Sequence, residues 1–185
     1  LFTWDDDAEA CYKLTLDIIQ KAQDWFAAQT AGKPAFGGQV RPTLAADERR
    51  AIAAKLMPAI RGLISKDRHK VGHFDDSPAV LEFLGSAMLT TLAPMGTSCP
   101  DHFLRTKIAP LVVDFDPAKP DLDATLASLA PAVAAYRADY AAYHDRCKHP
   151  DSPALRDPNA VVYLVPGVGM LSFAKDKATA RIAAE

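Results

Sequence analysis

Cysteine, excess positive charge and long apolar runs are all lacking in this sequence, and each absence excludes a class of protein. The 185 residues include 3 cysteines without regular spacing, so we predict no disulfide framework and a reducing, cytoplasmic location. No apolar run approaches the roughly 20 residues that a membrane-spanning helix needs, so no membrane partner is expected. With 21 Lys and Arg against 23 Asp and Glu, the net charge is −2, which makes nucleic acid a poor candidate partner.

Motifs that carry chemistry are also few. No Ser-His-Asp order, phosphate-cradling loop or paired-carboxylate motif stands out. Gly167 and Gly169 follow a predicted strand, but the third glycine of the dinucleotide fingerprint is missing, so a tight turn is favoured over a cofactor loop. His144, Cys147 and His149 crowd together near a predicted helix end, but the basic residues between them disfavour a metal ion.

The composition is that of a folded chain, with 49% hydrophobic and 24% charged residues. Strands alternate with helices, which predicts an α/β fold, with a layered sheet flanked by helices and a leading helical segment. Helices are predicted at residues 8 to about 30, 43–64, 79–84, 100–107, 122–148 and from 176 onward, and strands at 69–74, 111–115, 160–165 and 170–173. The sequence does not decide whether residues 85–96 form a loop or a helix. Pro58 is expected to kink or split the second helix, and a bend at Pro131 is left open.

Both ends of the sequence fall within predicted elements. The chain opens with a strand-like run at residues 1–4 and stops at Glu185 within a predicted helix, so we expect a fragment of a longer polypeptide. Residues 1–7 and 170–176 share a sequence pattern. In each, two apolar residues are followed by a hydroxyl residue, an aromatic residue, two further residues and an Asp that precedes a predicted helix. This internal echo predicts the end of one unit, at residues 1–42 with a linker, and a second, related unit at residues 43–185.

A polar corner at residues 97–102 precedes a predicted helix, whose free backbone N–H groups are suited to an anion such as phosphate or carboxylate. Arg105 and Lys107 are expected to add positive charge one and two turns further on, and the turn at residues 167–169 is expected to complete the pocket. The predicted anion or ligand site consists of Ser98, Cys99, Asp101, His102, Arg105, Gly167 and Gly169. The alternative is a capped helix with a surface histidine.

Three segments of the sequence carry a resemblance to a known family. They are LFTWDDDAEACYKLTLDIIQKAQDW at 1–25, GTSCPDHFLRTKIAPLVVDF at 96–115 and VYLVPGVGMLSFAKDKATARIAAE at 162–185. Together they resemble the middle of large bacterial bifunctional proteins, in which a class II aldolase (rhamnulose-1-phosphate aldolase-like) region precedes a short-chain dehydrogenase domain. The resemblance covers essentially the whole chain. It implies that residues 1–42 close a first aldolase-like unit and that residues 43–185 form a second, degenerate one.

The resemblance also implies zinc for the lyase and NAD(P) for the dehydrogenase of the parent protein, both outside this chain. In class II aldolases a His-x-His pair, a later His and usually a Glu hold the zinc. Thr97 and Cys99 stand where the paired histidines would be, and Val168 stands where the later histidine would be. Because one cysteine alone cannot hold a catalytic zinc, we carry over no catalytic residue, no metal ligand and no cofactor to this chain.

Two functions remain as hypotheses. The first is a fragment of an aldolase/dehydrogenase protein of sugar catabolism of the rhamnulose phosphate type, not catalytic alone, whose partner is the rest of the parent polypeptide. The second is a non-catalytic structural, assembly or anion-binding module that packs on the true aldolase unit. A self-contained dinucleotide-binding domain is disfavoured by the missing third glycine, and a homo-oligomer is left open.

Overall fold

The computed structural model describes residues 2–66, 68–97 and 100–185, with only the backbone described at Pro100 and Asp101. The chain forms two compact units, one ending at Pro34 and the other spanning Ala35–Glu185. The fold is α/β, with a four-stranded sheet flanked by helices and a separate leading helix, which confirms the predicted class. No helix in the described ranges is long and apolar enough to cross a membrane.

The first unit consists of the helix α1, Ala8–Thr30, and the short segment before it. Asp7 caps the helix, because its side chain accepts a hydrogen bond from the Ala10 backbone N–H at 3.0 Å. The expected strand at the start does not form at residues 2–5, because a strand needs a neighbour to pair with and no other strand lies in this unit. None of the helix is buried, and its aromatic residues Trp25 and Phe26 are exposed.

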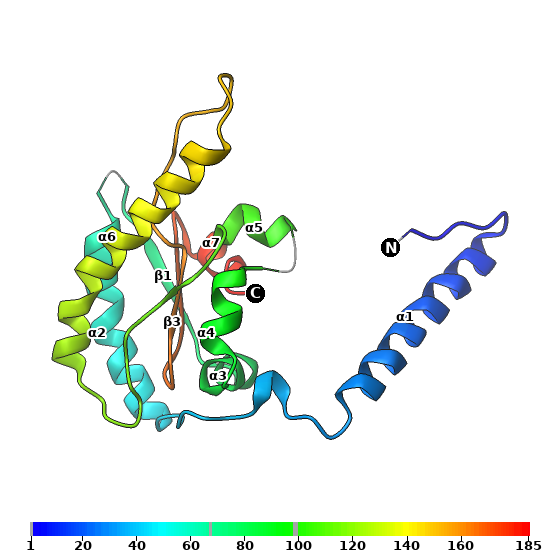
Figure 1. The fold of residues 1–185 in the computed structure, drawn as a ribbon, viewed down its shortest axis with the longest axis horizontal. Coiled ribbons are helices and arrows are strands. Elements are labelled where there is room, and N and C mark those ends of the chain that lie inside the picture. Colours follow the sequence, from blue (N-terminus) through cyan, green and yellow to red (C-terminus); the bar gives the residue numbers. More distant parts are fainter. Residues whose placement is uncertain (1, 67, 98–99) are drawn as a thin grey trace. The chain divides into compact units, whose positions relative to one another are not determined.

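The second unit is built on a sheet with the strand order β1-β4-β3-β2 (Figure 1). Its strands are β1 Val71–Asp75, β2 Leu111–Val112, β3 Val162–Val165 and β4 Gly169–Ala174. Strand β4 pairs antiparallel with both β1 and β3, while β2 pairs parallel with β3. β2 is shorter than its apolar run predicts, because only Leu111 and Val112 are in register with β3.

Helices cover both faces of this sheet, which Figure 1 shows nearly edge-on. The helices α2, Ala46–Ile64, and α6, Leu122–Cys147, pack on one face, where Tyr163 and Leu171 enter the larger core. On the other face Leu164 and Met170 pack with a smaller core. The helices associated with this second face are α3 Pro78–Gly85, α4 Leu89–Leu92, the 3₁₀ turn Ala93–Met95, α5 Pro100–Thr106 and α7 Lys177–Ile182.

Proline does not split the two long helices. Helix α2 continues through Pro58, contrary to the predicted split, and α6 continues through Pro131. Pro58 removes the hydrogen bond to the Ala54 carbonyl, but both residues are exposed, so water can replace that bond. The buried neighbours Leu56 and Ile60, both 0% exposed, anchor the helix on the core on either side of the proline.

The internal echo has a counterpart in local hydrogen bonding. Asp7 and Asp176 each cap the following helix, and the Asp176 side chain accepts from the Thr179 N–H at 2.7 Å. The Ser172 hydroxyl donates to the carbonyl eight residues on, in α7, at 2.7 Å. In the first segment, the Cys11 thiol donates to the carbonyl of Thr3, eight residues earlier in the chain, at 3.5 Å. The assignment of these two segments to two related units stays a prediction.

Candidate functional site

A cavity of about 590 Å³ lies on the second face of the sheet, between the strands and the segment around α5. Most of its wall is apolar and comes from β3, β4 and the turns beside α4, with Leu164 and Met170 on the sheet side. Its polar lining residues are Thr97, His102, Thr106, Lys107 and Glu185. A volume of this size is in the range of pockets for small molecules, so this is the cavity to compare with the predicted polar corner.

His102 is the predicted site residue that the structure places in this cavity. Its backbone carbonyl accepts the Thr106 hydroxyl at 3.0 Å, which holds it in the first turns of α5. Its Nε2 atom is buried and has no hydrogen-bond partner within the described residues. A buried ring nitrogen without a partner can accept from or donate to a ligand that enters the cavity. The surface histidine of the alternative interpretation is therefore not what the structure shows.

Lys107 lines the same cavity as His102, and the sequence predicted its charge near this corner but not its buried environment. It takes the left-handed conformation at the end of α5, with φ at 67°, and its N–H donates to the Phe103 carbonyl at 3.0 Å. Its ammonium group donates to the Asp157 carbonyl and lies 4.1 Å from the centre of the Tyr140 ring. The pKa of Lys107 is lowered to about 8, chiefly by burial and also by the charge of Lys70, while the charge of Asp157 acts in the opposite direction. No motif in the sequence identifies such a lysine, because its environment comes from residues far along the chain.

Of the remaining residues of the predicted site, the structure describes only Arg105 and the two glycines in full. Ser98 and Cys99 lie outside the described residues, and so does the side chain of Asp101. Arg105 is exposed, and it is not among the residues that line the cavity. The anion site proposed for this corner therefore stays a prediction, supported here through His102 alone.

The two glycines of the predicted site pack elsewhere in the unit. Gly167 takes φ of 71°, and a side chain there would meet the Pro42 carbonyl at 2.7 Å. Gly169 takes φ of 150°, and a side chain there would meet the Asp75 carbonyl at 2.8 Å. Both positions need glycine because another segment of backbone passes close by, which agrees with a tight turn rather than a cofactor loop.

A polar contact that the sequence did not predict joins α2 to the segment after β1. Arg49 donates from Nε and Nη2 to one carboxylate oxygen of Asp76, at 3.1 and 2.7 Å, and from Nη1 to the Leu44 carbonyl at 2.8 Å. The side chains are 14% and 27% exposed. Arg49 therefore does not lie on a solvated helix face, because the pair is enclosed between two elements that tertiary packing brings together.

The zinc that the family resemblance implies does not fit the residues described in this chain. No three His, Cys, Asp or Glu side chains among them converge closely enough to hold a metal ion. His144 instead contacts the Pro153 carbonyl through Nε2 at 3.2 Å, and Cys147 is exposed. Thr97 and Val168 stand at two of the expected ligand positions and offer no nitrogen or thiolate ligand. No chemical step in this chain can therefore be derived through a zinc ion held by these residues.

Comparison with known proteins places the chain in a family. Residues 51–185 match the family described as "Aldolase class II, second domain". The chain is also similar to the Bacillus subtilis protein named "Uncharacterized oxidoreductase YuxG", at 32% identity over 182 residues. That match covers 98% of this chain and 26% of the relative, so the chain spans about a quarter of that protein. No solved structure matches the chain. From the family match over most of its length, we conclude that the chain belongs to the class II aldolase second-domain family.

Proposed function

We propose that the chain is the middle part of a fused protein of sugar catabolism, and that it is not catalytic by itself. The parent protein would join a zinc-dependent class II aldolase of the rhamnulose-1-phosphate type to an NAD(P)-dependent short-chain dehydrogenase. The partner of this chain would then be the rest of the same polypeptide, in the cytoplasm. The observation that carries the proposal is the family match, since it concerns the second domain of a class II aldolase.

A further observation supports this proposal. The relative carries the name of an oxidoreductase and is about four times as long as the matched segment, as expected for a protein with additional domains.

An activity assay on two preparations tests the proposal. The 185-residue chain and the complete parent polypeptide are each incubated with rhamnulose 1-phosphate, with and without added zinc, and with NAD⁺ or NADP⁺ and candidate aldehydes. We expect aldol cleavage and pyridine-nucleotide reduction from the parent polypeptide and neither from the chain. Turnover by the chain alone that scales with its concentration and survives repurification would reject the proposal, as would a parent protein without either activity.

The second candidate is an assembly module that packs on the true aldolase unit. The exposed apolar side chains of α1, among them Leu16, Ile19, Trp25 and Phe26, favour it, because a chain rarely leaves such a face uncovered. A parent protein from which residues 8–185, α1 included, are deleted separates the two candidates. If the region serves assembly, this deletion lowers the oligomeric state measured by light scattering. Retention of the same oligomer and the same zinc content would exclude an assembly role.

A further inference from the structure

A second cleft, separate from the cavity described above, carries a concentrated positive charge. It has a volume of about 790 Å³. Its lining residues include six cations, Lys66, Arg68, Lys70, Arg137, Arg156 and Lys175, and we call it the basic cleft. Asp157 is the carboxylate among the described lining residues. A chain with a net charge of −2 therefore gathers a strong local excess of positive charge in one place.

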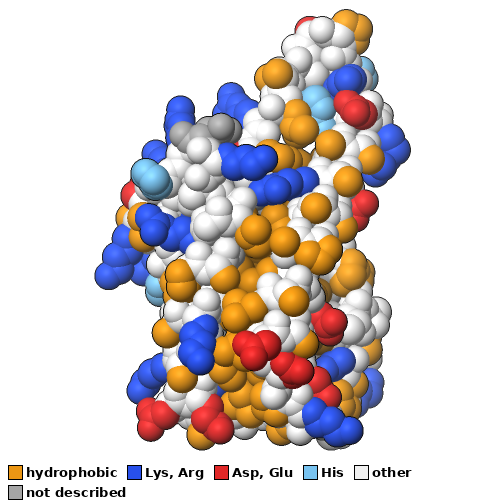
Figure 2. Space-filling view, turned by 90° about the vertical axis from the view of Figure 1, so that its left-hand side faces the viewer, with side chains coloured by type: hydrophobic (Ala, Val, Ile, Leu, Met, Phe, Trp, Pro, Cys, Tyr) orange, Lys and Arg blue, Asp and Glu red, His pale blue; other side chains and the backbone are white. Residues whose placement is uncertain are grey.

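The cations of the basic cleft come from segments that are far apart in the sequence. They lie on the loop after α2, at the start of β1, on α6, in the loop before β3 and after β4. Figure 2 shows Lys and Arg side chains gathered in the upper part of the face that α2 and α6 cover. Only the tertiary fold brings these charges together, and their mutual repulsion lowers stability unless an anion lies among them.

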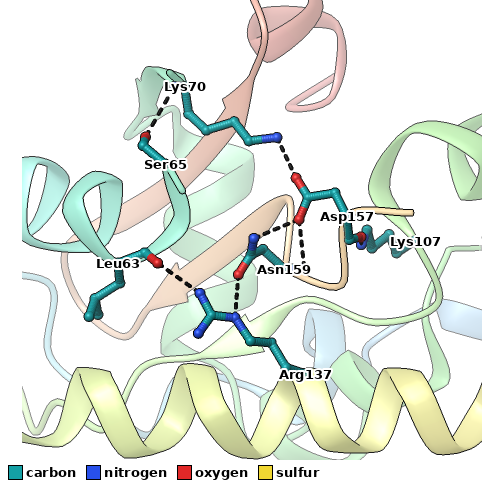
Figure 3. Close-up of polar contacts among 7 residues, drawn as sticks. All are labelled: Leu63, Ser65, Lys70, Lys107, Arg137, Asp157 and Asn159. Carbon is teal, nitrogen blue, oxygen red and sulfur yellow. Dashed lines mark hydrogen bonds and ion pairs between the residues drawn. The ribbon is translucent and has the colours of Figure 1, made fainter. Parts of the chain in front are cut away.

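Asp157 is engaged within the wall of the cleft and does not neutralise the outer cations. Figure 3 shows its carboxylate between the Lys70 ammonium, with which it forms an ion pair, and Asn159. The Asn159 side-chain amide donates to it at 2.6 Å and the Asn159 backbone N–H at 2.9 Å. Burial would raise the pKa of Asp157, but the hydrogen bonds and charge of Lys70 and the bonds from Asn159 hold that pKa below its ordinary value.

Arg137 is fixed by the same network, and one end of its guanidinium group is left without a partner. Its Nε donates to the Asn159 side-chain oxygen at 2.6 Å and its Nη2 to the Leu63 carbonyl at 2.7 Å (Figure 3). Its Nη1 makes no hydrogen bond with any described residue. A guanidinium group held in this way is preorganised to donate to an oxyanion, because little side-chain freedom is lost on binding.

The outer cations are unpaired in the part of the chain that the structure describes. Lys66, Arg68, Arg156 and Lys175 are exposed, and no described carboxylate forms an ion pair with any of them. Ile64, Leu155 and Pro158 also line the cleft. The cleft thus combines a fixed guanidinium group, several exposed cations and a partly apolar wall, which together suit an organic molecule with a multiply charged anionic group.

We propose that the basic cleft binds a small phosphorylated molecule, with its phosphate group among the cations that line the cleft. A phosphate monoester carries close to two negative charges and three acceptor oxygens, which matches several converging Lys and Arg donors better than a single carboxylate does. A volume of about 790 Å³ is suited to a small ligand. The site is separate from the corner at residues 97–102, and it does not depend on whether the chain is catalytic.

Binding of defined anions to the 185-residue chain tests this site. Isothermal titration calorimetry at low ionic strength and pH 7 uses inorganic phosphate, glycerol 1-phosphate, glycerol and malonate as probes. The cleft variant combines Lys66→Gln, Arg156→Gln and Lys175→Gln. The control variant removes the same number of charges from exposed positions that do not line the cleft: Lys21→Gln, Lys55→Gln and Lys119→Gln. Because all six positions are exposed, both variants are expected to fold, which circular dichroism checks.

We expect saturable binding of glycerol 1-phosphate and none of glycerol. The cleft variant should bind the phosphate ester about tenfold more weakly or worse, because charge-assisted hydrogen bonds are lost, while the control variant stays within about twofold. Binding of inorganic phosphate as tight as that of the ester would show that the ion alone is recognised, and tighter binding of the ester would show that the apolar wall contributes. Both results support the site.

Three results would overturn the proposal. Equal weakening in the cleft and control variants would show that only net charge matters. Malonate bound as tightly as the phosphate ester would remove the assignment to phosphate. A double-stranded oligonucleotide bound far more tightly than the ester, with an affinity that falls steeply with salt, would show that the cleft serves nucleic acid instead.

Discussion

Replacing the buried Tyr163 with phenylalanine should stabilise the protein. The side chain of Tyr163 is 0% exposed in β3, and its hydroxyl has no hydrogen-bond partner within the described residues. Its ring packs edge-on against Phe173, with the ring centres 5.6 Å apart, and that contact survives in Tyr163→Phe. Burial raises the pKa of this hydroxyl, which reports the same loss of contact with water.

The expected gain follows from the cost of burying an unpaired polar group, about 1–3 kcal/mol. Part of that cost is recovered by relaxation around the site, so we expect the free energy of unfolding to rise by about 1 kcal/mol. For a chain of this length that corresponds to an increase in Tm of about 2–4 °C. Urea denaturation followed by circular dichroism measures the first quantity, and thermal denaturation measures the second.

Tyr136 supplies the matched control for this substitution. It lies in α6 and its hydroxyl donates to the Ala109 carbonyl at 2.8 Å, so Tyr136→Phe removes a hydrogen bond that is made. We expect the free energy of unfolding to fall by about 1 kcal/mol in this variant. If Tyr163→Phe destabilises the protein as much as Tyr136→Phe does, the Tyr163 hydroxyl has a partner in solution and the reasoning is refuted.

Three further substitutions test other parts of the structure. Between about pH 8 and 10.5 the folded lysine at position 107 has lost its proton while the unfolded one keeps it, so the free energy of unfolding should rise with pH. Lys107→Met should abolish this rise, which urea titrations at several pH values measure. An equal rise of the unfolding free energy in both proteins would contradict this prediction. Gly96→Ala should cost about 1–3 kcal/mol, since φ is 78° and the new carbon would meet the Ile108 carbonyl oxygen at 1.9 Å; an unchanged Tm would show that the turn rearranges freely. Arg49→Gln should lower the free energy of unfolding by about 1.5–3 kcal/mol, because it leaves Asp76 unpaired. Arg50→Gln is the exposed control. If both substitutions cost the same, the Arg49–Asp76 pair contributes nothing.

Helices were predicted well because the signals that begin them are local. Asp7 and Asp176 lie three residues before the backbone N–H groups that they accept from, so the cap can be recognised within one turn. Pro78 stands in the first turn of α3, one residue before the predicted start at residue 79, as its fixed backbone angle favours. The continuation of α2 through Pro58 could not be predicted in the same way, because it depends on the burial of Leu56 and Ile60.

Strand boundaries and site composition were predicted less well, since both depend on partners elsewhere in the chain. The apolar run at residues 111–115 looks like a full strand, but the neighbouring strand pairs with only two of its residues. His102 was identified from its place at a polar corner, and the structure puts it in a cavity. The buried environment of Lys107 and the basic cleft were missed, because they depend on Asp157, Lys70 and Arg137, which no sequence spacing connects.

The sequence by itself determined the α/β class, the helix starts and the family resemblance of this protein. Those features rest on periodicity, capping and short motifs, in which the interacting groups lie within a few residues of one another. The tertiary structure alone decided where side chains lie: the buried His102 nitrogen without a partner among the described residues, the Arg49–Asp76 pair, and the six cations that line one cleft with Asp157. Burial and charge are properties of a position in space, so they are settled only when distant segments such as the loop after α2 and the loop before β3 pack together.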